Sequence, residues 1–125
     1  MSQAGWIWIC AVHSAGFALF HLAFWRLFNW PASLRATTRP NRAILQIANL
    51  QLVVVFAGVA AMCVAFPGPL GSSPLGRALL GGMALFWAVR LVGQFIWLRV
   101  HHPLVHALSA LFALGVVAFG VAASG

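Results

Sequence analysis

Residues 43–66 read AILQIANLQLVVVFAGVAAMCVAF and carry no charge at any position. A helix crosses the hydrocarbon core of a bilayer, which is about 30 Å thick, with about 20 predominantly apolar residues. This stretch meets that length, and its three polar side chains, Gln46, Asn49 and Gln51, are uncharged amides. The stretch therefore predicts a transmembrane helix, and it decides the fold class.

Three more segments of the same kind surround it. Together they predict four transmembrane helices at about residues 6–28, 41–66, 75–99 and 104–123. Ser73 is placed to cap the third helix, and Pro74 and Pro103 stand where a first helical turn tolerates proline. We therefore expect an all-α integral membrane protein with a single antiparallel four-helix domain over residues 1–125.

The composition excludes a soluble domain. Of 125 residues, 63% are hydrophobic and only 6% are charged, so an exterior in water would be almost wholly apolar. All charged side chains are arginine, and the chain has no Asp or Glu. This excludes catalysis by paired carboxylates and Mg²⁺ or Ca²⁺ sites built from carboxylates. No nucleic acid is expected as a partner, because the arginines lie at helix ends and not in a basic patch with interleaved aromatics.

The distribution of arginine predicts the orientation in the membrane. The side that holds the first and third connections carries Arg26, Arg35, Arg39, Arg42 and Arg99. The second connection has only Arg77 nearby. Because cytoplasmic loops carry the excess of positive charge, both termini are expected on the non-cytoplasmic side. The absence of lysine is typical of a GC-rich bacterial genome, so we expect a multi-pass protein of the bacterial inner membrane.

Polar residues of the predicted spans gather in the cytoplasmic half. They are His21 on the first helix, Arg42, Gln46 and Asn49 on the second, Arg90 and Gln94 on the third, and His102, His106 and Ser109 on the fourth. Residues three or four apart share a helix face, so these residues form polar stripes. Polar side chains in hydrocarbon face the bundle interior or a wet cavity, so the stripes predict a pocket. Apart from His102 and Ser109, these residues are the predicted ligand or cofactor contacts.

Arg90 is the most informative of them. An arginine at the centre of a transmembrane helix costs about 3 kcal/mol on insertion scales, and this chain has no carboxylate to pair with it. This cost must be offset by another group. The candidates are helix carbonyls with Gln46 or Asn49, an anionic lipid, an anionic cofactor or an acidic residue of a partner subunit. Snorkelling to the headgroups is the alternative. Trp87 lies one turn away, where a cation–π contact is geometrically possible.

The histidines allow metal or haem binding. His102 and His106 have the i, i+4 spacing that binds a transition metal from one helix face, and His21 falls in the same layer. His21 and His106 are also candidates for axial ligands of haem b, with an arginine for a propionate. The alternatives are a capping role for His102 and a hydrogen-bonded structural role for His21.

Cys10 and Cys63 lie at similar depth near the outer ends of the first two helices. A disulfide that faces an oxidising periplasm is one interpretation, and apolar packing of two free thiols is the other. Gln51 points away from the Gln46 and Asn49 stripe, which indicates a contact with another protomer or subunit.

Two functional hypotheses follow from these residues. The first is a membrane module that binds an anionic or redox ligand on its cytoplasmic side, with haem or a quinone headgroup as the favoured occupant. The second is an accessory or assembly subunit of a larger membrane complex, or a homo-oligomer, in which Arg90 pairs with another chain's carboxylate. No residue pattern predicts a particular enzymatic reaction.

The outline also resembles the MAPEG family of membrane glutathione transferases. The resemblance covers four helices in about this length and the pattern Arg39-Pro-Asn-Arg42…Gln46…Asn49, with Arg90 on the third helix. It implies a trimer that binds glutathione through Arg42, Gln46, Asn49 and Arg90 and conjugates it to a lipophilic electrophile. That family normally carries a Glu in the second-helix motif and a Tyr near the site, and this chain has neither residue type.

The orientation gives a first testable prediction. Reporter fusions at Gly125 and in the 67–73 connection should report the periplasm, and a fusion within 33–38 should report the cytoplasm. A paired phosphatase and fluorescent-protein reporter at each position measures this directly. A C-terminal fusion active only in the cytoplasm would refute the orientation and the depth assigned to the polar stripes.

Overall fold

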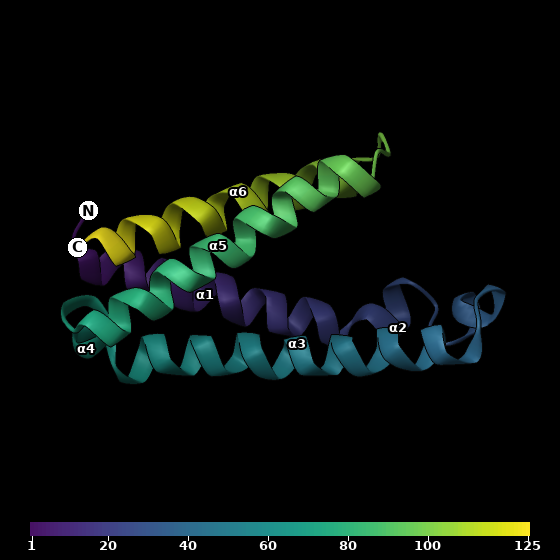
Figure 1. Cartoon of the computed structure of the whole chain (residues 1–125), viewed down its shortest axis with the longest axis horizontal. Helices are drawn as coiled ribbons and strands as arrows, with labels where there is room; N and C mark the ends of the chain where they lie inside the picture. The colour runs from purple at the N-terminus through teal and green to yellow at the C-terminus, as the bar shows by residue number, and fades with distance from the viewer. The chain divides into compact units, whose positions relative to one another are not determined.

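The computed structural model describes all residues from Met1 to Gly125, and it is helical throughout, without strands (Figure 1). Its elements are α1 (Gln3–Leu22), α2 (Phe24–Leu27), the 3-10 helix η1 (Ala32–Ala36), α3 (Arg39–Ala65), α4 (Pro67–Ser72), α5 (Pro74–Trp97) and α6 (Pro103–Ser124). Four of them, α1, α3, α5 and α6, are long and apolar enough to cross a membrane. This confirms the four predicted helices and indicates a multi-pass membrane protein.

Two local features differ from the prediction. The first helix was expected to run unbroken to residue 28, but α1 ends at Leu22 and the short α2 follows. At the break the amide N of Ala23 lies 3.1 Å from the carbonyl oxygens of both Leu19 and Phe20. Such sharing between i−3 and i−4 acceptors marks the tighter winding of a helix end. The second connection, expected to be irregular, forms α4, whose first residue Pro67 loses no intrahelical hydrogen bond there.

The chain divides into two compact units. The first unit comprises 1–10 and 62–125, and the second comprises 11–61. Helices α4, α5 and α6 belong to the first unit together with the start of α1 and the end of α3. The single four-helix domain stays a prediction from the sequence.

Helices α5 and α6 lie side by side in the first unit (Figure 1). Leu80, Trp87 and Phe119 are fully buried there. At the far end from the α5–α6 turn, Nε2 of Gln3 donates to the carbonyl oxygens of Gly71 and Ala122, both at 2.9 Å. These bonds tie the start of α1 to α4 and to the last turn of α6.

Both predicted N-caps are present. The Ser73 hydroxyl accepts from the amide of Gly76 at 2.9 Å, and Nδ1 of His102 accepts from the amide of Leu104 at 3.1 Å. Pro74 and Pro103 occupy the first turns of α5 and α6, as expected. The capping interpretation of His102 is therefore confirmed.

In the second unit, aromatic rings join α1 to α3. The ring centroid of Phe56 lies 6.0 Å from that of Phe17 and 5.1 Å from that of His21. Nη1 of Arg42 donates to the carbonyl oxygen of Thr37 at 2.8 Å and so anchors the connection that precedes α3. These contacts hold the helices of this unit together without any ion pair.

Cys10 and Cys63 are both buried in the first unit, and both are free thiols. The structure therefore shows two packed free thiols and no disulfide between them.

Gly76 marks the closest backbone approach, between α4 and α5. A Cβ atom on Gly76 would overlap the Cα atom of Leu70 and the carbonyl oxygen of Pro69. Only glycine fits there without a shift of backbone. Gly76→Ala should therefore destabilise the fold by about 1–3 kcal/mol, the usual cost of overpacking.

Gly82→Ala is the matched control on the same helix, because a Cβ atom there meets nothing within 4 Å. It should leave stability unchanged or raise it by up to about 1 kcal/mol, the helix preference of alanine over glycine. Thermal unfolding in detergent compares the two variants. Equal midpoints would show that the α4–α5 approach is not as close as described.

Candidate functional site

The predicted site residues fall into two clusters, one in each unit. The α5–α6 cluster contains Arg90, Gln94, His106 and Ser109. The α1–α3 cluster contains His21, Trp25, Arg42, Gln46 and Asn49. Each cluster is built by polar stripes at helical spacing, as the sequence predicts.

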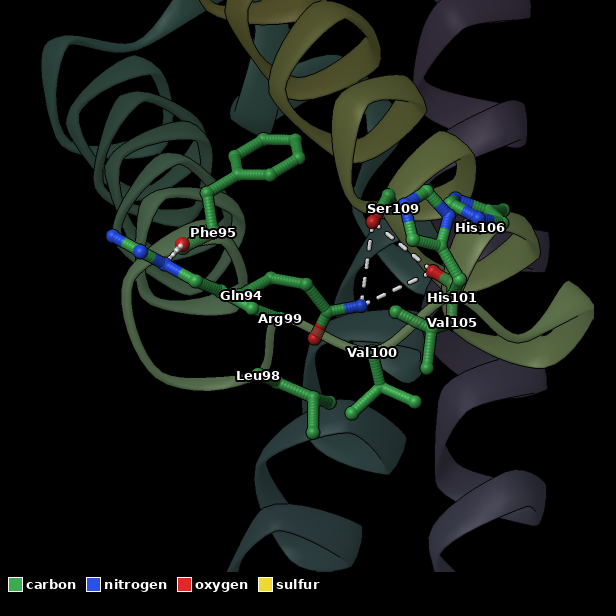
Figure 2. Close-up of a pocket in the computed structure, with 9 residues that line it drawn as sticks. All are labelled: Gln94, Phe95, Leu98, Arg99, Val100, His101, Val105, His106 and Ser109. Atoms are coloured by element: carbon green, nitrogen blue, oxygen red, sulfur yellow. Dashed lines mark hydrogen bonds between the residues drawn. The ribbon is translucent and has the colours of Figure 1, made fainter.

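Gln94 is the centre of the α5–α6 cluster and is only 1% exposed. Its Oε1 accepts from Nη1 of Arg90 at 3.0 Å. Its Nε2 donates to the carbonyl oxygen of Val105 at 3.2 Å and to Oγ of Ser109 at 3.3 Å, as Figure 2 shows. The buried amide therefore bridges α5 and α6, and both its donor and its acceptor atoms are engaged.

The guanidinium of Arg90 is held from two sides. One Nη1 bond goes to Gln94, and the central carbon of the guanidinium lies 4.5 Å from the ring centroid of Phe112. Phe112 in turn stacks on Trp87 at 5.6 Å with an interplanar angle of 19°. The sequence made a cation–π contact with Trp87 geometrically possible, and the structure places the Phe112 ring against the guanidinium. Arg90 itself is exposed, and its neutral contacts orient the charge without cancelling it.

A hollow of about 280 Å³ opens at the end of α5 and the start of α6 (Figure 2). We refer to it as the turn hollow. Gln94 and Ser109 line it together with Arg99, His101 and His106. The Arg99 side chain runs back along α5, where its Nε donates to the carbonyl oxygen of Phe95 at 3.1 Å. The hollow thus combines a polar floor with cationic or titratable side chains and has no acidic group.

The histidine beside His106 is His101 and not His102. The ring centroids of His101 and His106 are 5.4 Å apart, with an interplanar angle of 53°. His102 stands before the helix in extended conformation, φ −143° and ψ 139°, and its ring caps α6. His102 is thus the N-cap residue before α6, and its pairing with His106 around a metal stays a prediction.

Nowhere in the chain do three or more His, Cys, Asp or Glu side chains form a group that could hold a metal ion. The metal set of His21, His102 and His106 stays a prediction from the sequence.

In the α1–α3 cluster, His21 and Asn49 hold each other in place. Nδ1 of His21 donates to the carbonyl oxygen of Phe17 at 2.8 Å, and the ring stacks on Phe24 at 4.6 Å. Nδ2 of Asn49 donates to the backbone oxygen of His21 at 2.8 Å. Asn49 is 3% exposed, and its Oδ1 accepts no hydrogen bond. This buried acceptor has capacity for a donor from another molecule.

Gln46 links α2 to α3 in the same cluster. Its Oε1 accepts from Nε1 of Trp25 at 3.1 Å, and its Nε2 donates to the backbone oxygen of Arg42 at 3.1 Å. Trp25 lies near a helix end, where tryptophan is typical of an interfacial belt. Its indole donor instead fixes the orientation of Gln46.

Sequence reasoning also missed Phe112 and His101. Phe112 lies three residues after Ser109. It therefore falls on the same face of α6 as the polar stripe, and this spacing could have identified it. His101 had no such signal, because it lies in the turn, where periodicity gives no direction.

No family model, no curated protein and no solved structure matches this chain. The function is therefore inferred from the geometry of the two clusters.

The bridging role of Gln94 is testable. Gln94→Leu keeps the volume but removes the hydrogen bonds of the amide to Arg90, Val105 and Ser109, which should lower stability by about 1–3 kcal/mol, at about 1 kcal/mol or less per bond. Gln51→Leu is the matched control, because Gln51 lies exposed on α3. Thermal unfolding in detergent gives both values. A Gln94→Leu protein as stable as Gln51→Leu would contradict the bridge.

Proposed function

We propose that the protein is a four-span antiparallel membrane protein of the bacterial inner membrane, with both termini outside the cytoplasm, that binds an anionic ligand in its cytoplasmic half. The observation that carries the proposal is Arg90. It is a fixed positive charge inside the membrane-compatible helix α5, about two turns before its end, in a chain without a single acidic residue.

The neutral contacts of Arg90 support this reading. Gln94 and the Phe112 ring position the guanidinium but leave its charge unbalanced. A guanidinium stays protonated at physiological pH, so it cannot lower its cost by losing a proton as a lysine can. An anion brought by another molecule offsets the desolvation cost at short range. A propionate, a phosphate or a ligand carboxylate each has the required charge.

Of the two favoured redox ligands, haem b matches the charge better than a quinone headgroup. Haem carries propionates that pair with arginine, whereas a quinone headgroup offers only hydrogen-bond acceptors. The Nδ1 bond of His21 to a backbone carbonyl is the arrangement that orients histidines toward haem iron or a transition metal.

An accessory-subunit role, or a homo-oligomer, is the second candidate, and the exposure of Arg90 favours it. An exposed arginine on an apolar helix reaches a neighbouring chain as readily as a ligand. The glutathione-transferase alternative draws less support, because Arg42, Gln46 and Asn49 donate to protein oxygens within their own unit.

Arg90→Gln tests the proposal. The substitution removes the charge and keeps donors, so the fold should persist while the bound anion or partner is lost, by about tenfold or more for a partly buried pair of opposite charges. Arg35→Gln is the control with the same change in net charge, because Arg35 lies exposed in η1.

Gently purified proteins are compared by absorbance spectrum, metal content and native mass. A Soret band, a bound anion or a retained subunit in the wild type that Arg90→Gln loses supports the proposal and identifies the occupant. Equal recovery from all three proteins would refute a binding role for Arg90.

A further inference from the structure

We propose that the turn hollow is a phosphate site, which receives the phosphate of an anionic phospholipid headgroup or of a free phosphorylated compound. The inference rests on the proposed function, since Gln94 and His106 belong to both, and it names the ligand class at that site. Its own observation is the arrangement of His101, His106 and Arg99 around a hollow of about 280 Å³.

The donors that face the hollow are uncommitted. His101 and His106 contact each other through their rings at 5.4 Å and make no hydrogen bond to the protein. Arg99 uses only Nε, toward the carbonyl oxygen of Phe95, so its two terminal nitrogens remain available. The floor of the hollow offers no free amide donor, because Nε2 of Gln94 already donates to Val105 and Ser109. The donors available to a ligand in the hollow are therefore the imidazoles, and Arg99 adds positive charge to its lining.

The charge of the surroundings selects an anion over a metal ion. Two neighbouring imidazoles could in principle share a transition metal. A divalent cation, however, would add charge next to Arg99 and Arg90 in a chain that has no carboxylate to balance it. An anion in the same place is attracted by every charged group nearby.

The position and rim of the hollow favour phosphate. The hollow lies where the apolar stretch of α5 ends, which is the level of lipid headgroups for a helix that spans the bilayer. Its rim includes Phe95 and Val100, whose side chains are 63% and 52% exposed and suit acyl chains. A phosphate has more acceptor oxygens than a carboxylate, so both imidazoles can donate to one group.

The test uses the full chain in mild detergent and measures bound phospholipid by native mass spectrometry. Wild type should retain phosphatidylglycerol over phosphatidylcholine, whose headgroup has no net charge. His101→Ala and His106→Ala should each weaken phosphatidylglycerol binding about fivefold, the factor that corresponds to the loss of one hydrogen bond worth about 1 kcal/mol. His102→Asn is the matched control from the same turn, because asparagine keeps the N-cap and His102 does not line the hollow.

A parallel arm adds inorganic phosphate. Displacement of phosphatidylglycerol by millimolar phosphate, lost in His101→Ala, assigns a free-phosphate source, and retention of the lipid assigns the headgroup. The inference is overturned if both histidine variants bind phosphatidylglycerol as wild type does, or if His102→Asn loses as much. Zinc binding that depends on both histidines, without selectivity for phosphatidylglycerol, would overturn it in favour of a metal site.

The two proposals fail differently. If Arg90→Gln releases the anion while the histidine variants keep it, the proposed function stands and the phosphate site falls. If the histidine variants release the lipid while Arg90→Gln keeps it, the phosphate site is supported and the binding role of Arg90 is refuted.

Discussion

Because the chain contains no aspartate or glutamate, each arginine must find neutral acceptors or an anion from outside. Three arginines use backbone oxygens near helix ends: Arg42 on Thr37, Arg77 on Ala123 and Ser124, and Arg99 on Phe95. Carbonyls near a helix C-terminus carry partial negative charge, which suits a cation. These arginines thus stabilise connections and helix ends within each unit, and no salt bridge is involved.

Arg90 does not fit this scheme, because its acceptor is the side chain of Gln94 in the interior of α5. Backbone carbonyls there are already used by the helix itself. The amide that takes their place is fixed by α6 through Val105 and Ser109. The direction of the charge therefore depends on how α5 and α6 pack, so the site and the fold of the first unit are coupled.

The sequence predicted what periodicity and length control. It located the four long helices, the caps at Ser73 and His102, and the polar stripes that become the two clusters. It did not find the break at Ala23, where no proline or glycine marks the end of α1. The sequence also suggested that His102 and His106 share a helix face, because they are four residues apart. In the structure His102 is the N-cap of α6 and has an extended backbone conformation. Side-chain partners in turns depend on backbone angles that spacing does not encode.

Under the proposed function, the hydrogen bonds of Gln94 limit how the first unit could recognise a ligand. An amide with free donors would recognise the shape of a ligand through directed hydrogen bonds, but the acceptor of Gln94 is used by Arg90 and its donors are used by α6. The groups left for the proposed recognition are the remaining nitrogens of Arg90 and the imidazoles of the turn. Interactions of charged groups select the charge of a ligand before its shape. The proposed site would therefore discriminate anionic from neutral amphiphiles more sharply than it discriminates one anion from another.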